Sequence, residues 1–301
     1  MKRDFKYLSD LRAEGVLSVL DRADELKAIR RDGGRSPRPL EGKSVALIFE
    51  KASTRTRVSF EVGVYELGGH PVVLSSKDTQ MGRGEPIEDT ARVLGRYVHA
   101  IVIRTFEDAK LIALAKAAPV PVVNALTDGA HPCQILADLQ TVRERKDTLR
   151  GLKYAWIGDG NNVANSWIEA ATLLGLELTL ACPEGYDPTQ ATTGGASGAK
   201  VTVVRDPRAA VKNADVVITD VWASMGQEAE QSKRAAAFAG FCVNPALMAE
   251  AKNDAIVLHC LPAHRGEEID GVYLEREDAP IWDEAENRLH TQKAVLEYLV
   301  R

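Results

Sequence analysis

Residues 44–67 read SVALIFEKASTRTRVSFEVGVYEL, in which an apolar run leads into a turn rich in hydroxyls and arginine and then into a helical pattern. The run Val45–Phe49 predicts a buried strand, and the apolar spacing from Val58 onward predicts a helix. The first N–H groups of a helix lack partners within it, and the helix dipole favours negative charge there. Ser53–Arg57 adds three hydroxyls and two guanidinium groups, which bind phosphate oxygens well. We therefore predict a site for a phosphorylated substrate; an ordinary helix cap with surface arginines is the alternative.

The composition is that of a globular protein. The chain has 301 residues, of which 45% are hydrophobic and 27% charged, enough for one large domain or two of ordinary size. A net charge of -5 argues against a nucleic-acid-binding surface. No apolar run is long enough to cross a bilayer, and Met1–Phe5 does not begin a signal peptide, so we expect a cytoplasmic protein without membrane contact. The 4 cysteines form no Cys-x-x-Cys pair, which predicts free thiols and no structural zinc site.

Strand and helix patterns alternate along most of the chain. Strands are predicted at 44–49, 70–74, 100–103, 120–124, 153–157, 176–181, 200–204, 215–219 and 255–259. This alternation predicts an α/β fold of two domains, each a mostly parallel β-sheet flanked by helices. We expect a first domain of residues 1–130, joined by a C-terminal helix at about 288–301 because chain ends often lie close together. The second domain is then 131–287, with 131–146 as the linking helix.

Polar residues follow many of the predicted strands. In open parallel sheets, ligands bind beyond the carboxyl ends of the strands. The segments at those ends are Ser53–Arg57, Arg104, Asn124–His131, Gly158–Asn162, Asp220 and His259–Pro262. Because they come from both predicted domains, we expect an active site in the cleft between the domains.

The segment GDGNNV at 158–163 follows a predicted strand and opens a helix, as a dinucleotide-binding loop would. The Rossmann fingerprint, however, needs a third glycine where Val163 stands. It also needs an acidic residue after the next strand, where Ala181-Cys182-Pro183 stands instead. We therefore predict no nicotinamide cofactor and interpret Asn162 as an amide directed into the cleft.

Three other residues could take part in chemistry, and each has an ordinary alternative. His131 could polarise a carbonyl or shuttle protons, with the Gln134 amide one turn further along the same face, or it could simply start a helix. Cys260 follows a strand and could be a nucleophile, a proton acceptor or part of the packing. Asp220 could bind a substrate ammonium group or cap the next helix.

Four motifs together resemble those of the transcarbamoylase family, and within it the branch that uses ornithine. They are FEKASTRTR at 49–57, HPCQ at 131–134, DVWASMG at 220–226 and HCLPAHR at 259–265. The first two are typical of the whole superfamily, and the last two distinguish ornithine from aspartate as the acceptor. The resemblance runs from about residue 5 to the C-terminus. It implies transfer of the carbamoyl group of carbamoyl phosphate to the side-chain amine of L-ornithine, giving L-citrulline and phosphate in arginine biosynthesis, with no metal or organic cofactor.

The resemblance also implies a role for each residue that matches a family motif. Carbamoyl phosphate would be bound by Ser53, Thr54, Arg55, Thr56, Gln80, Arg104, His131, Gln134, Cys260, Leu261 and Arg288. L-Ornithine would be bound by Asn162, Asp220, Ser224 and Met225. The catalytic residues would be Cys260, Arg104, His131 and Asp220. In this family the residue matching Gln80 comes from a neighbouring subunit, which implies a homotrimer with shared active sites.

Two other functions remain open at this point. One is a sibling transferase that uses putrescine or an acetylated ornithine, although Ser224-Met225-Gly226 and Cys260-Leu261 favour free ornithine. The other is a non-catalytic anion-binding protein of the same fold, against which the phosphate motif, His131 and Cys260 argue together. The polar segment 220–241 is flanked by glycines, so we predict a mobile lid, with a solvated surface helix as the alternative.

Overall fold

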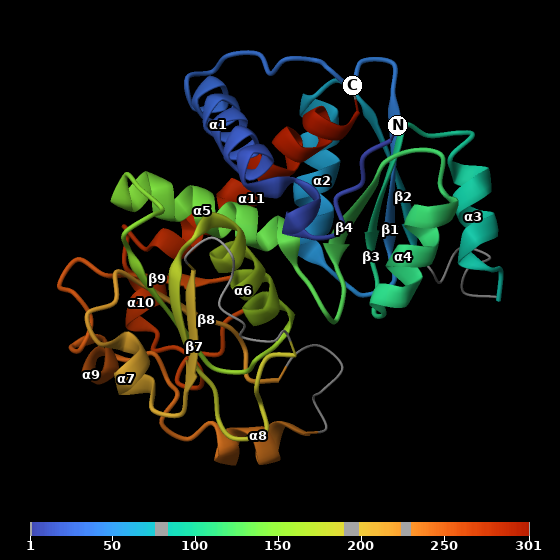
Figure 1. Cartoon of the computed structure of the whole chain (residues 1–301). Coiled ribbons are helices and arrows are strands. Elements are labelled where there is room, and N and C mark those ends of the chain that lie inside the picture. Colours follow the sequence, from blue (N-terminus) through green and yellow to red (C-terminus); the bar gives the residue numbers. More distant parts are fainter. Residues whose placement is uncertain (1, 76–83, 190–198, 224–229, 301) are drawn as a thin grey trace. The chain divides into compact units, whose positions relative to one another are not determined.

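The computed structural model describes residues 2–75, 84–189, 199–223 and 230–300. The chain divides into two compact units, of which unit 1 comprises Met1–Gln140 and Glu286–Arg301 and unit 2 comprises Thr141–Ala285 (Figure 1). Helices α5 (Pro132–Lys146) and α11 (Pro280–Leu299) each contain one of the two passages between the units. The division expected from the sequence lies just before α5, whereas this division lies within it. Among the described helices, none is both long and apolar enough to cross a membrane.

Unit 1 contains a sheet of four parallel strands in the order β2-β1-β3-β4. The strands are β1 (Ser44–Phe49), β2 (His70–Ser75), β3 (Ala100–Arg104) and β4 (Val122–Leu126). The helices are α1 (Arg12–Arg31), α2 (Thr54–Glu66), α3 (Ile87–Leu94) and α4 (Asp108–Ala117), after a short 3-10 turn at Leu8–Asp10. Pro71 is tolerated in β2 because an edge strand needs fewer ladder hydrogen bonds. Helix α3 ends at Leu94, with Gly95 as its C-cap.

The strand order of unit 1 reverses between β1 and β3. The chain moves outward from β1 to β2, and then returns past β1 to β3 and β4. Right-handed crossovers therefore place α2 on one face of the sheet and α3 and α4 on the other. The gap that this reversal leaves at the carboxyl ends of β1 and β3 is where ligands bind in such sheets.

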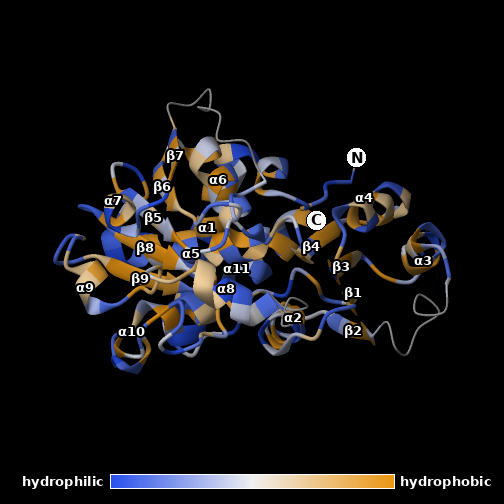
Figure 2. Ribbon diagram, turned by 90° about the horizontal axis from the view of Figure 1, so that it is seen from below, coloured by the Kyte–Doolittle hydropathy of each residue, from blue (hydrophilic) through white to orange (hydrophobic). Residues whose placement is uncertain are grey.

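The core of unit 1 explains why these runs form strands. Ile48, Ile101 and Ile103 lie in one cluster with Leu111 and Leu114 of α4, all fully buried. Strands buried on both faces read as continuous apolar runs, as β1 and β3 do. Figure 2 shows the strands mainly in the hydrophobic colour, whereas helices such as α3 and α4 carry both colours.

Unit 2 contains a sheet of five parallel strands in the order β7-β6-β5-β8-β9. The strands are β5 (Lys153–Ile157), β6 (Glu177–Ala181), β7 (Lys200–Val204), β8 (Val216–Thr219) and β9 (Ile256–His259). The helices that lie wholly within it are α6 (Asn162–Leu174), α7 (Pro207–Val211), α8 (Gln231–Ala237), α9 (Pro245–Met248) and α10 (Val272–Glu275). Here the order reverses between β5 and β8, which makes that pair of strand ends the corresponding position in unit 2.

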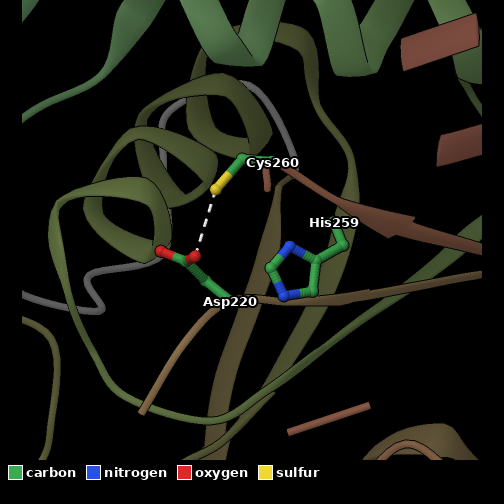
Figure 3. A group of neighbouring side chains, drawn as sticks. All are labelled: Asp220, His259 and Cys260. Carbon is green, nitrogen blue, oxygen red and sulfur yellow. Dashed lines mark hydrogen bonds between the residues drawn. The ribbon is translucent and has the colours of Figure 1, made fainter. Parts of the chain in front are cut away.

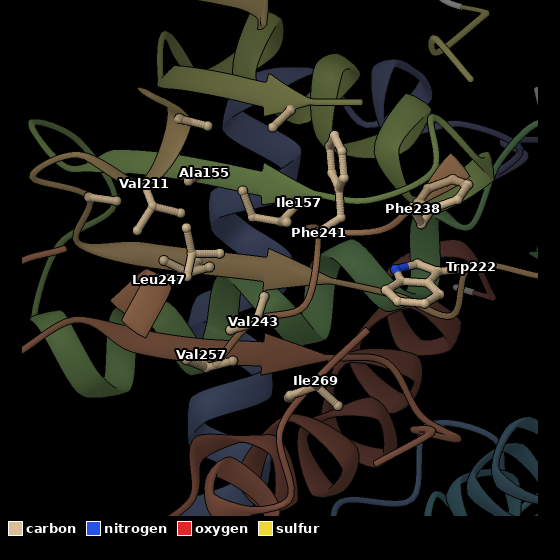
Figure 4. Packing of buried hydrophobic residues seen from close by; sticks show 14 of the residues in the cluster. Ala155, Ile157, Val211, Trp222, Phe238, Phe241, Val243, Leu247, Val257 and Ile269 are labelled. Atoms are coloured by element: carbon tan, nitrogen blue, oxygen red, sulfur yellow. The ribbon is translucent and has the colours of Figure 1, made fainter. Parts of the chain in front are cut away.

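The core of unit 2 extends from the sheet to the segment around α8. Ile157 and Val217 share a buried cluster with Trp222, Phe238 and Phe241 (Figure 4). The rings of Trp222 and Phe238 are stacked with centroids 5.7 Å apart. Trp222, which precedes residues 224–229, and Phe238, which follows them, are therefore both held in the core of unit 2.

Candidate active site

The phosphate motif lies at the strand reversal of unit 1. Phe49, the last residue of β1, is paired in register with Arg104, the last residue of β3. Ser53 is the N-cap of α2, and its side chain accepts a hydrogen bond from the Thr56 N–H at 3.3 Å. The strand and the following helix thus form as the sequence predicted, and the Ser53 cap is the feature that was weighed there as the alternative. Together they bring the first turn of α2 beside the end of β3.

Thr56 is fully buried and its hydroxyl oxygen lies between two arginines. It accepts a hydrogen bond from Arg104 at 3.3 Å and a second from Arg288 at 2.8 Å. Both guanidinium groups are themselves buried, at 8% and 3% exposure. Two buried positive charges at one hydroxyl make this a strong anion-binding position, since the charges lose their hydration and gain from an anionic ligand.

Arg288 also binds Gln134, which links α11 to α5 within unit 1. The Arg288 guanidinium donates to the Gln134 amide oxygen at 3.0 Å, and the Gln134 amide nitrogen donates to the Asp138 carboxylate at 2.8 Å. Gln134 is 0% and Asp138 1% exposed. We call the residues that surround this position the arginine cluster: Thr56, Arg104, His131, Gln134 and Arg288.

His131 is held as a neutral imidazole in the arginine cluster. It is almost completely buried, and its backbone carbonyl accepts the Gln134 N–H at the start of α5. Burial lowers the pKa of His131 well below its usual range, and the positive charges of Arg288 and Arg104 lower it further. At physiological pH the ring is therefore neutral, and its one N–H group can donate a hydrogen bond to a carbonyl oxygen.

The other predicted carbamoyl-phosphate residues of unit 1 have different surroundings. Thr54 and Arg55 are exposed on the first turn of α2, unlike the buried Thr56. Gln80 lies outside the described residues. Lys51, which sequence reasoning did not select, is a buried neighbour: it pairs with Asp128 and lies 4.4 Å from the centre of the Phe106 ring. A lysine inside the motif was visible in the sequence, but its partners come from other strand ends.

The strand reversal of unit 2 brings together Asn161 and Asp220. The register pairs Ile157 with Thr219, so the loops that follow β5 and β8 start side by side. The Asn161 amide nitrogen donates to the Asp220 carboxylate at 2.7 Å. The Asn161 oxygen accepts from the N–H groups of Val163 and Ala164, which makes Asn161 the N-cap of α6. Sequence reasoning selected Asn162, which is half-buried as the first residue of α6, and missed the direct contact of its neighbour.

Gly160 has a structural reason that does not involve a nucleotide. A Cβ atom at this position would lie 2.1 Å from the backbone nitrogen of Pro188 and 2.4 Å from the carbonyl carbon of Asp187. The loop therefore needs a glycine because another loop passes closely over it. Since Asn161 already caps the first turn of α6, the glycines of this segment are explained by packing and capping.

Cys260 and Asp220 form the second contact at this reversal (Figure 3). The Cys260 thiol donates to the Asp220 carboxylate with a sulfur–oxygen distance of 3.1 Å. The other partners of this carboxylate include the Val221 N–H at 2.8 Å. Asp220 is only 6% exposed. Its carboxylate accepts hydrogen bonds from three loops at the edge of the sheet, through Asn161, Val221 and Cys260. A carboxylate with a thiol beside it suits the binding of a substrate ammonium group.

His259 supports the residues that follow β9. Its Nδ1 accepts the Leu261 N–H at 2.9 Å, and its Nε2 lies 2.9 Å from the Glu268 carboxylate. An accepting Nδ1 leaves the proton of the neutral ring on Nε2, which donates it to Glu268. Leu261 has a left-handed backbone with φ 57 and is joined to Pro262 by a cis peptide bond. The backbone of this turn is therefore held by a fully buried histidine–glutamate pair.

Two groups of described side chains have the composition of a metal site. They are Asp220 with His259 and Cys260, and His264 with Glu267 and Glu268. Both ring nitrogens of His259 already have protein partners, so coordination there would have to break one of these contacts. The second group shares Glu268, which accepts hydrogen bonds from His259 and from the His264 N–H. In the function proposed for this chain, Asp220 and Cys260 contact the substrate directly and do not act as metal ligands.

Arg234 of α8 connects three parts of unit 2. One of its nitrogens donates to the Asp159 carboxylate at 2.8 Å and to the Trp222 carbonyl at 2.7 Å, and its guanidinium lies 5.0 Å from the centre of the Tyr186 ring. Burial raises the pKa of Asp159, and the charge of Arg234 opposes this shift. Of the segment predicted as a lid, residues 220–223 and 230–241 are described, and Ser224 and Met225 lie outside the described residues.

Comparisons with known proteins agree with this arrangement. Residues 3–144 match the family described as "Aspartate/ornithine carbamoyltransferase, carbamoyl-P binding domain", and residues 150–299 match its Asp/Orn binding domain. The chain is 54% identical to an ornithine carbamoyltransferase of Geobacter metallireducens over 100% of both chains. It is 56% identical to one of Acidothermus cellulolyticus, over 100% of this chain and 97% of the relative. Among solved structures, the ornithine carbamoyltransferase of Pyrococcus furiosus superposes with a TM-score of 0.94 at 49% identity, over 99% of this chain and 97% of that one.

Proposed function

Because the chain belongs to the aspartate/ornithine carbamoyltransferase family, we propose that it transfers the carbamoyl group of carbamoyl phosphate to the side-chain amine of L-ornithine. The products are L-citrulline and phosphate. The observation that supports this most directly is the arginine cluster, in which two buried guanidinium groups donate to the Thr56 hydroxyl. That cluster suits a ligand that carries both a phosphate group and a carbonyl oxygen.

In this proposal unit 1 binds carbamoyl phosphate. Its phosphate group is bound by Ser53, Thr54, Arg55 and the N–H groups of the first turn of α2. Its carbonyl oxygen accepts hydrogen bonds from Thr56, Arg104 and the neutral His131, and its amino group donates to the Gln134 oxygen. As the amine attacks, negative charge develops on the carbonyl oxygen, and removing one donor to such an oxygen typically costs roughly 3–4 kcal/mol. Arg55, which binds the phosphate, also stabilises it as the leaving group.

Unit 2 binds L-ornithine in this proposal. Asp220 orients the amine together with Cys260, and Asn162, Ser224 and Met225 bind the amino-acid end. The side-chain amine has a lysine-like pKa of about 10, so it is mostly protonated at neutral pH and has to lose a proton before it can attack. The carboxylate of Asp220, which accepts the Cys260 thiol at 3.1 Å, lies where it can hold that ammonium group. Cys260 and Leu261 would also contact the carbamoyl group.

The test is a transfer assay with a choice of acceptors. Purified protein is mixed with carbamoyl phosphate and L-ornithine, putrescine, acetylornithine or aspartate, and phosphate release is measured. We expect release with L-ornithine alone, with citrulline formed in equal amount. Release with putrescine but not ornithine would assign the chain to a sibling transferase, and no release with any amine would favour a non-catalytic anion-binding protein.

A matched pair of arginine variants tests the phosphate assignment in the same assay. Arg55→Ala should lower kcat/KM for carbamoyl phosphate at least about tenfold, because a charge-assisted contact to phosphate is lost. Arg57→Ala is the control, since Arg57 is exposed and pairs with Glu61 on its own helix. Full activity of Arg55→Ala would remove Arg55 from the site.

The same family relationship supports a cytoplasmic homotrimer that works in arginine biosynthesis. Helix α2 exposes Val58 and Tyr65, at 51% and 75% exposure. A subunit contact over α2 would cover these two side chains. Gln80 would then reach the site of a neighbouring subunit. A monomeric species that retained full activity in light-scattering and assay measurements would contradict the shared site.

A further inference from the structure

We propose that Asp138 is a positioning residue that orients the Gln134 amide, so that the enzyme distinguishes a carbamoyl group from an acetyl group. This inference rests on the proposed function, because it assigns the Gln134 oxygen to the amino group of carbamoyl phosphate. Asp138 matches none of the motifs that identify the site. It lies one helical turn after Gln134 on α5, where side chains four residues apart meet.

The contacts of Gln134 determine which way its amide points. A carboxylate has only acceptors, so the end of the amide that faces Asp138 at 2.8 Å has to be the NH₂ group. A guanidinium group has only donors, so the end that faces Arg288 at 3.0 Å has to be the oxygen. The two contacts agree on one orientation. A flipped amide would set donor against donor and acceptor against acceptor, in a position from which water is excluded.

This orientation matters for the substrate because an amide oxygen has two lone pairs. In the proposed complex one accepts from Arg288 and the other accepts an N–H of the carbamoyl group. Acetyl phosphate has a methyl group in place of the amino group and cannot donate. With a flipped Gln134, the amide NH₂ would meet the carbamoyl NH₂, and the preference for carbamoyl phosphate would be lost.

The alternative is that Asp138 only stabilises α5. A Gln–Asp pair four residues apart adds a small amount to helix stability, whatever the ligand. The two roles differ in what they predict for ligands. A positioning role affects carbamoyl phosphate selectively, whereas a purely structural role affects carbamoyl phosphate, acetyl phosphate and inorganic phosphate alike.

The experiment compares KM for carbamoyl phosphate with the inhibition constants of acetyl phosphate and inorganic phosphate. For Asp138→Ala we expect KM for carbamoyl phosphate to rise roughly tenfold, the size of a lost hydrogen bond in a buried site. The inhibition constants of acetyl phosphate and inorganic phosphate should stay within about twofold of their wild-type values. If the alanine variant does not fold, Asp138→Leu, which also cannot accept, carries the same expectation. Asp138→Asn keeps an oxygen acceptor and should retain most of the discrimination.

The matched control is Asp24→Ala. The Gln140 amide nitrogen donates to Asp24 at 2.9 Å, the same kind of contact from the same helix α5, and Gln140 has no role in the proposed site. This variant should leave all three constants unchanged. In a Gln134→Ala background, Asp138→Ala should cause no further loss of discrimination, because its effect passes through Gln134.

Three results would overturn the inference. They are an equal change for all three ligands, an unchanged ratio of carbamoyl to acetyl phosphate in Asp138→Ala, and a further loss of discrimination when Asp138→Ala is added to Gln134→Ala. Failure of the proposed function itself would give a different result, because the wild-type protein would then release no phosphate with any amine.

Discussion

At the scale of single residues, the chemistry of unit 1 is concentrated at the Thr56 hydroxyl. Its oxygen accepts from Arg104 and Arg288, which come from β3 and α11. Both arginines are buried, so they depend on such acceptors and on a bound anion to replace the water that they lose on folding. The neutral state of His131 has the same origin, since burial and these two charges lower its pKa.

Replacing Thr56 by valine tests this arrangement without changing the volume of the side chain. Thr56→Val removes the shared acceptor and leaves two buried charged donors without it, at a cost of about 1.5–3 kcal/mol for each such hydrogen bond. We expect kcat/KM for carbamoyl phosphate to fall roughly 10- to 100-fold. Steady-state kinetics measure this. Thr90→Val is the control, because the buried Thr90 hydroxyl donates to Glu85 outside the arginine cluster, and a similar loss there would point to general destabilisation.

At the scale of elements, the short helix α8 is joined through Arg234 to the loops that precede and follow Asp220 in the site. Arg234 ties this helix to Asp159 and to the carbonyl of Trp222. Asp159 belongs to the same loop as Asn161, which contacts Asp220. The side chains of Arg234 and Phe238 are buried, which a fully solvated surface helix would not allow. Within α8, the solvated-helix alternative therefore describes only the exposed face.

Removing Arg234 should damage unit 2 and the ornithine site together. Arg234→Ala leaves the buried Asp159 carboxylate without its cation, which typically costs about 3–5 kcal/mol of stability. We expect a lower melting temperature and a raised KM for ornithine, with KM for carbamoyl phosphate little changed. Arg208→Ala is the control, because its ion pair with Glu250 is exposed and such pairs contribute about 0–1 kcal/mol. Equal effects of the two variants would contradict the role of Arg234.

At the scale of the whole molecule, the stability of the protein should depend on pH through buried histidine. His290 on α11 has no exposed side-chain surface, and burial lowers its pKa to about 4. The unfolded chain binds a proton near the ordinary value of about 6.5, whereas the folded chain does so only near 4. The contribution of neutral His290 to the free energy of unfolding is therefore fully present above about pH 6.5 and is lost as the pH falls towards 4.

Thermal unfolding at pH 7.5 and pH 5.0 tests this dependence. His290 should account for about 2 kcal/mol of the stability lost between these values. His290→Gln carries no titrating group, so its melting temperature should fall less than that of the wild type, by several degrees. His70→Gln is the control, since His70 is exposed at the start of β2. Equal pH dependence of the wild type and His290→Gln would contradict the prediction.

The sequence alone determined the parts of the protein that depend on neighbouring residues. The apolar runs of β1 and β3, the Ser53 cap and the position of Arg104 at a strand end all follow from local patterns. The start of α11 does not: we predicted the last helix from about residue 288, yet it begins at Pro280. Its first turns carry the buried Glu284 and Asn287, and polar residues that are buried through distant partners leave no apolar periodicity to read.

Only the tertiary structure decided how the site residues are paired. Arg288 meets Thr56 across 232 residues of sequence, and no local pattern encodes such a contact. The structure likewise gives Asn161 the contact with Asp220 and fixes the Gln134 amide between Asp138 and Arg288. Local backbone preferences act within a few residues, and the sequence reveals them directly. Ser53–Arg57 therefore predicted an anion-binding site from its own residue types. The partners of Thr56 appeared only in the folded chain, because they depend on which strand ends and helices the fold brings together.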